Sequence, residues 1–141
     1  MSEVTFEIPG EPMGKQRPKF RSTGKFVQTY TPDKTVNYET LVKELYAINQ
    51  YPMLQGELSV EVTAYLTIPE SASQKKKDQM KNGDMHPTKK PDLDNILKII
   101  CDALNKIAYK DDAQIVSAHV YKVFAVERPF VRVKIREVRG D

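Results

Sequence analysis

The chain has 141 residues, a formal net charge of +3 and one cysteine. A chain of this length can form one domain that buries about two thirds of the surface its unfolded form exposes, so neither a disulfide nor a structural metal ion is needed for stability. Cys101 has no partner for an intrachain disulfide, and no apolar leader or membrane-length apolar run occurs. We therefore expect one domain, residues 1–141, in a reducing cytoplasmic compartment, without membrane insertion.

The first half of the chain predicts a strand, a helix and a second strand. Val4–Ile8 alternates apolar and polar residues, as strands do, and proline and glycine follow it. After a segment rich in proline, glycine and basic residues, Thr31 resembles an N-cap, and the apolar residues beyond it keep helical spacing to about Gln50. Leu58–Ile68 is rich in β-formers and predicts a central strand.

The second half begins with an expected exposed basic insertion at residues 71–89, where apolar residues are scarce. Ser73 could cap a short helix there that Asn82 ends, or the segment is mobile without nucleic acid. A helix follows from about Asp94, and the β-rich runs 114–126 and 130–138 predict a hairpin. The expected fold class is α+β, with a mixed β-sheet packed against helices in a compact domain.

The predicted helix has a wide apolar arc and one narrow polar stripe. The stripe consists of Asp94, Lys98, Asp102 and Asn105. Each uncompensated polar group on such a buried helix would cost about 2 kcal/mol or more. We therefore expect the stripe to be paired within itself, with a metal ion, or with water in a cleft.

Four carboxylates flank this helix in an otherwise basic chain. Asp92 and Asp94 stand at its entrance, and Asp111 and Asp112 follow its end. Two carboxylates held close together favour a cation between them. Oxygen ligands without nearby cysteine or histidine favour Mg²⁺ or Mn²⁺ over zinc. The second pair can join the first only if the following turn and strand bring one of its members back.

A structural role explains the same residues equally well from spacing alone. Asp94 is suited to be the N-cap of the helix, and Asp111 with Asp112 fits an ordinary turn before a strand. Lys98 would then form an i, i+4 ion pair with Asp94 or Asp102, worth a few tenths of a kcal/mol.

Two basic runs accompany the acids, and both are expected to contact DNA phosphates. Their members are Lys15, Arg17, Lys19 and Arg21 in the first run and Lys75, Lys76, Lys77 and Lys81 in the second. Alternate spacing places the first four on one side of an extended chain. The alternative for either run is a solvated loop or helix face.

The acidic stretch resembles the RusA family of Holliday-junction resolvases. The matching segments are Pro91-Asp92-Leu93-Asp94-Asn95, Lys98, Asp102-Ala103-Leu104-Asn105 and Asp111-Asp112-Ala113-Gln114. The N-terminal part is similar as well, through Ile8-Pro9-Gly10, Lys15-Gln16-Arg17-Pro18 and Tyr30-Thr31-Pro32. The resemblance is weakest from Tyr51 to Lys89, and the insertion at 71–89 is long for the family.

The resemblance implies a homodimeric, Mg²⁺-dependent endonuclease that cuts four-way DNA junctions, with Mn²⁺ as a substitute and no small-molecule cofactor. Asp92, Asp94 and Asp112 match the family's catalytic, metal-binding acids, and Lys98 matches its functional lysine. Supporting roles fall to Asp102, Asn95 and Asp111. Two alternatives stay open: a non-catalytic basic DNA-binding protein, and a nuclease for other branched DNA such as flaps or forks.

Overall fold

The computed structural model describes residues 2–17, 19–24, 26–30 and 32–138, with the backbone alone at 19–21, 23 and 26–30. The strands are β1 (Glu3–Pro9), β2 (Lys19–Thr23), β3 (Phe26–Tyr30), β4 (Leu58–Leu66), β5 (Ile115–Phe124) and β6 (Phe130–Glu137). The helices are α1 (Asp33–Ile48), α2 (Gln74–Lys81) and α3 (Leu93–Leu104), and a 3-10 turn, η1 (Asp112–Gln114), precedes β5.

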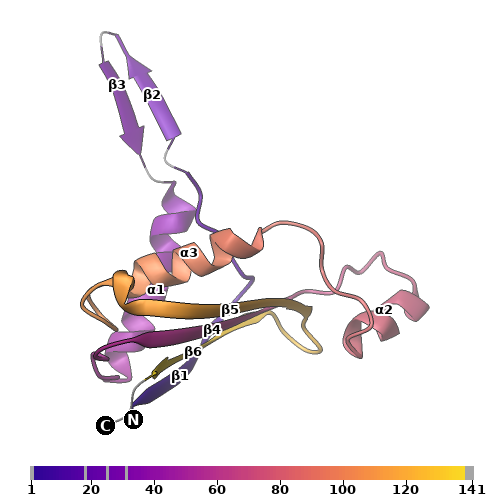
Figure 1. The fold of residues 1–141 in the computed structure, drawn as a ribbon. Coiled ribbons are helices and arrows are strands. Elements are labelled where there is room, and N and C mark those ends of the chain that lie inside the picture. The colour runs from indigo at the N-terminus through magenta and orange to yellow at the C-terminus, as the bar shows by residue number, and fades with distance from the viewer. Residues whose placement is uncertain (1, 18, 25, 31, 139–141) are drawn as a thin grey trace.

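Four strands form one sheet in the order β1-β6-β4-β5, and β2 and β3 form a separate hairpin. Helices α1 and α3 lie on one face of the sheet, the hairpin projects away from the body, and α2 stands off the opposite end (Figure 1). β4 is central, as expected: it pairs antiparallel with β6 and parallel with β5. The fold is therefore α+β with a mixed sheet.

The core lies between the sheet and the two helices. Alternate residues of β4, from Leu58 to Leu66, are buried, because period-two side chains of a strand share one face. They form one cluster with Val42 and Tyr46 of α1 and with the apolar side of α3. Tyr46 also meets Phe6 of β1 edge-to-face, with 5.7 Å between the ring centroids. This packing fixes α3 against the sheet.

Helix α3 confirms the predicted apolar arc. Ile96, Ile99 and Ile100 are fully buried, whereas Asp94 and Lys98 on the opposite side are exposed. The helix begins at Leu93, so that Asp92 occupies the N-cap position and Asp94 lies in the first turn. The N-cap prediction for Asp94 is therefore wrong by two residues.

The predicted hairpin of residues 114–126 and 130–138 is wrong, although both runs are strands. β4 lies between β5 and β6. Strands two places apart are separated by about 10 Å, and a five-residue connection can span up to about 17 Å, so the chain can cross the end of β4. The crossing is anchored by the N–H of Ala125, which donates to the carbonyl of Leu66 at 2.7 Å. β4 thereby gains a partner on each side.

The basic segments also take defined structure. The first contains the β2–β3 hairpin, which was not predicted. In the insertion, α2 begins after Ser73, whose side chain accepts the N–H of Lys76 at 3.3 Å, and ends before Asn82, as the first alternative proposed. Along the described part of the chain, no helix combines the length and the apolar character needed to cross a membrane.

Candidate active site

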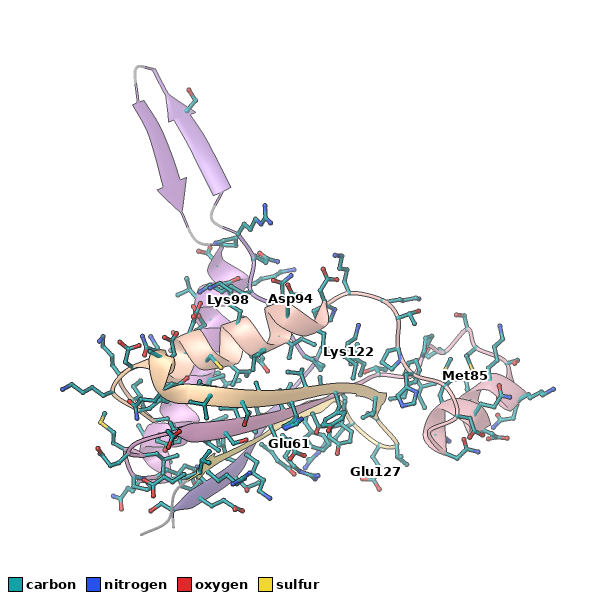
Figure 2. All side chains as sticks on the ribbon, in the orientation of Figure 1. Glu61, Met85, Asp94, Lys98, Lys122 and Glu127 are labelled. Carbon is teal, nitrogen blue, oxygen red and sulfur yellow. The ribbon has the colours of Figure 1, made fainter. Side chains whose placement is uncertain are left out.

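A polar cleft lies at the N-terminal end of α3. It has a volume of about 480 Å³ and is lined by Lys15, Gln16, Arg17, Asp92, Asp94 and Asn95. The helix supplies both carboxylates, because its N-cap and first turn carry them and its positive dipole end favours negative charge there. Figure 2 shows Asp94 and Lys98 on the side of α3 that faces away from the sheet. The cleft therefore offers two exposed carboxylates to a ligand.

The opposite wall of the cleft is the chain segment before β2. The N–H of Lys15 donates to the carbonyl of Asn95 at 2.8 Å, which ties this segment to α3. A Cβ atom added at Gly14 would lie 3.0 Å from the Cβ atoms of both Asn95 and Pro91, so the close approach requires glycine. Gln16 and Arg17 are thereby placed beside the acids.

The polar stripe of α3 is compensated by ion pairs. Lys15 Nζ lies 2.9 Å from a carboxylate oxygen of Glu39 and 3.3 Å from one of Asp102, and Lys98 lies 3.5 Å from the same Asp102 oxygen. Partial burial by itself would lower the pKa of Lys15, but Glu39 and Asp102 raise it above its ordinary value. Lys15 thus joins α1 to α3. Its predicted phosphate contact stays a prediction.

Two lysines remain accessible around the acid pair. Lys98 keeps 61% of its side chain exposed despite its ion pair. Lys90, which sequence reasoning did not select, places its Nζ 2.8 Å from an oxygen of Asp92 and is 82% exposed. Neither lysine is held firmly, since exposed ion pairs contribute at most about 1 kcal/mol. Both can therefore turn toward a phosphate.

The second acidic pair lies at the other end of α3. Asp111 caps η1. Its carboxylate accepts a hydrogen bond from the N–H of Ala113 at 2.9 Å, and the side-chain oxygen of Gln114 accepts one from the N–H of Asp111 at 3.0 Å. The Ala113 bond holds the pKa of Asp111 below its ordinary value. The turn before β5 that would give Asp111 a structural role is therefore present. The N–H of Asp112 donates to the side-chain oxygen of Asn105 at 3.0 Å, which fixes Asp112 beside the end of the helix.

One chain does not bring the two pairs together. Asp94 and Asn105 are separated by most of the length of α3, about 16 Å at a rise of 1.5 Å per residue. Asp112 is bonded to Asn105, and β5 starts from there, so the return that would bring Asp112 to Asp92 does not occur within the subunit. Among the residues that the structure describes, no three acidic, histidine or cysteine side chains gather closely enough to hold a metal ion.

Apart from Lys15, the predicted DNA-binding residues fall into three groups. Arg17 is exposed at the cleft. Lys75, Lys76 and Lys81 are exposed on α2, where Lys77 is half-buried. Lys19 and Arg21 lie in β2, and their side chains are outside the described residues. Exposed basic side chains thus lie both at the acidic cleft and on α2.

Gln16 was missed because it is uncharged and has no sequence signal of its own. Lys90 stands at the end of the second basic run, next to the acids, but was not among the predicted DNA-binding residues. Burial raises the pKa of the Cys101 thiol to about 11, so it is not a reactive thiolate near neutral pH.

Comparison with known proteins agrees with this geometry. The family described as "Endodeoxyribonuclease RusA" matches residues 9–136. The chain is also 37% identical, over 142 aligned residues, to the uncharacterized protein YqaN of Bacillus subtilis (strain 168), an alignment that covers 98% of this chain and 99% of YqaN. The match includes both walls of the cleft, all of α3 and the turn that carries Asp112. The chain therefore belongs to the RusA family of endodeoxyribonucleases.

Proposed function

We propose that this protein is a Mg²⁺-dependent endonuclease that resolves four-way DNA junctions by paired, symmetric phosphodiester cleavage. The observation that carries the proposal is the cleft at the start of α3, where Asp92 and Asp94 face Gln16 and Arg17 across a space of about 480 Å³. Membership of the RusA family supports this activity. The adjoining lysines suit a polyanionic substrate.

The cleft residues fit a hard divalent cation, because Asp92 and Asp94 offer only oxygen atoms and both are exposed. When bound, Mg²⁺ would supply Lewis acidity toward a phosphate oxygen and lower the pKa of a bound water. Arg17 would orient the phosphate from the opposite wall. Lys98, one helical turn beyond Asp94, would stabilise the negative charge that develops during cleavage. Binding of the cation would also release Asp92 from Lys90.

The third acid of the proposed site, Asp112, would come from outside the subunit, and the geometry of β5 supports a second copy of the chain as its source. β5 is an edge strand of ten residues, with β4 as its only strand partner in the described structure. Large apolar side chains are exposed on this strand: Val116 at 56% and Tyr121 at 50%. A long edge strand with exposed apolar residues favours pairing with another chain.

Antiparallel pairing of two β5 strands would complete the acidic site. Asp112 lies just before the start of β5. Near its end, Lys122 Nζ donates to the carbonyl of Lys89 at 2.5 Å, so this end adjoins the entrance to α3 (Figure 2). Across a two-fold axis, the start of one strand faces the end of the other. Asp112 of the partner subunit would then lie beside Asp92 and Asp94.

Mixed dimers of two inactive variants test the function and the shared site together. Asp94→Asn and Asp112→Asn are each expected to abolish Mg²⁺-dependent cutting of a synthetic four-way junction while junction binding persists. A dimer that combines one chain of each kind would have one complete site and one doubly defective site. We therefore expect it to nick one strand, whereas sites confined to single subunits would leave it inactive.

The matched control is Asp111→Asn, which changes the neighbouring carboxylate and can still cap η1 because asparagine is an equally good N-cap. It should retain paired cutting. Mg²⁺-dependent cleavage by the Asp94→Asn homodimer would contradict the nuclease assignment. If the unmodified protein cleaved four-way junctions, flaps and forks equally, the nuclease assignment would stand, but the proposed preference for four-way junctions would be wrong.

A further inference from the structure

A second cavity lies beside the acidic cleft, at the end of the sheet where the parallel strands β4 and β5 finish. Its volume is about 450 Å³, and its walls come from the end of β4, from α2 and from the segment that joins α2 to α3. Figure 1 shows α2 and this segment standing off that end of the sheet. Ligands of open sheets commonly bind outside the carboxyl ends of parallel strands.

The floor of this cavity is apolar. Leu66 and Met80 line it and are each 8% exposed, and Phe124, Met85 and Pro87 complete it. Met85 and Phe124 are half-buried, so parts of both side chains are accessible from the cavity. An aromatic ring beside two flexible thioethers favours a flat, polarisable ligand.

The rim is positively charged. Lys76, Lys89 and Lys90 line the cavity, and the one acidic side chain among its lining residues, Glu11, accepts a hydrogen bond from Thr67. Three cations with one engaged acid favour a ligand that carries negative charge. Lys90 also pairs with Asp92 at 2.8 Å, so the cavity is adjacent to the acidic cleft.

We propose that this cavity binds one nucleotide unit, with its base on the apolar floor and its phosphate on Lys76 and Lys89. The inference rests on the proposed function: a DNA strand held at Asp92 passes next to the cavity, and a base at the crossover of a junction can leave its stack at low cost. The base held in the cavity would select the sequence at which the protein cuts.

Methionine methyl NMR spectra, recorded without divalent ions, test this binding independently of cleavage. Met80 and Met85 line the cavity, whereas Met53 does not and is 45% exposed. Addition of deoxynucleoside 5′-monophosphates should shift the Met80 and Met85 methyl signals and leave that of Met53 unchanged. Absence of these shifts, or equal shifts with inorganic phosphate alone, would overturn the proposal.

Two neighbouring lysines of α2 provide a matched pair of variants. Lys75 and Lys76 are both exposed, but Lys76 lines the cavity and Lys75 does not. Lys76→Glu should weaken nucleotide binding by about tenfold or more, as expected when a phosphate contact becomes a repulsion. Lys75→Glu should change it much less. Equal effects of the two substitutions would indicate a diffuse charge effect and contradict a built site.

The source of the nucleotide is tested with intact DNA and the Asp94→Asn protein, which should bind junctions without cutting them. Four-way junctions with a single abasic residue at successive positions around the crossover are compared through the same methyl signals. Loss of the Met80 and Met85 shifts at one position would identify the base that enters the cavity. A cavity that responds to free nucleotides but to no junction would overturn the DNA assignment and leave the nuclease proposal intact.

Discussion

At the scale of single residues, Lys15 shows how a basic side chain can serve the fold beside a binding site. Its ammonium lies between Glu39 of α1 and Asp102 of α3, and 21% of its side chain is exposed. The alternate spacing of the basic residues predicted a phosphate contact for Lys15. Such spacing shows which side chains lie on the same side of an extended chain, but it does not show which other side chains they contact. The partners come from helices that start 18 and 78 residues further along the chain.

Lys15→Met should lower the free energy of unfolding by about 1–3 kcal/mol, because it leaves the largely shielded carboxylate of Glu39 without its cation and Asp102 with Lys98 alone. The pKa of Lys15 is raised in the folded state, so its stabilisation is fully present below the ordinary value of 10.5 and is lost as the pH rises through the folded value. Denaturant unfolding at several pH values measures this. The difference between the two proteins should stay constant near neutral pH and shrink as the pH rises above 10.5 through the folded value. A difference that persists after the Lys15 ammonium has lost its proton would contradict the ion-pair explanation.

At the scale of elements, local patterns predicted most helices and strands but not their pairing. The 3.6-residue period of α3 fixes its buried side, and Ser73 and Asn82 bound α2 as their capping preferences indicate. The position of β4 between β5 and β6 has no local sequence signal, because it depends on which strand pairs with a neighbour along both of its edges. For the same reason, spacing selected Asp92 and Asp94, which line one cleft, but could not show that α3 holds Asp112 apart from them.

The contact between the N-terminal segment and α3 gives a prediction at this scale. Gly14→Ala adds a methyl group at a position with no spare room and no unusual φ, so it should push residues 14–17 away from α3. We expect about a tenfold or greater loss of cleavage rate, because small displacements of positioning groups are costly in catalysis. The melting temperature should change by only a few degrees. Single-turnover cleavage and thermal unfolding measure the two effects, and an unchanged rate would show that the segment has no catalytic role.

At the scale of the whole molecule, the proposed β5 pairing would join two four-stranded sheets into one continuous sheet with both acidic sites on the helical side. A four-way junction needs two related cuts, and a two-fold dimer provides two related sites. The helical side carries α3 with its cleft, and the β2–β3 hairpins would extend from the same dimer (Figure 1).

The double substitution Val116→Glu and Tyr121→Glu should make the protein monomeric, because it would add four negative charges along the two paired edge strands. Its control is Val36→Glu with Ile48→Glu, which removes two large exposed apolar side chains of α1, outside this strand. Analytical ultracentrifugation measures the oligomeric state. A dimeric β5 variant, or a monomeric control, would contradict the proposed interface.

The parallel pairing of β4 with β5 also has a consequence for folding and assembly. The two strands are joined by residues 67–114, which contain α2, α3 and both acidic pairs. We expect pairing across so long a connection to close late in folding, since the loop entropy must be overcome before the contacts form. The strand that we propose as the dimer edge would then dock late. Subunits would expose a competent edge only after the helix that carries Asp92 and Asp94 has been built, so assembly would select chains whose cleavage site is already folded.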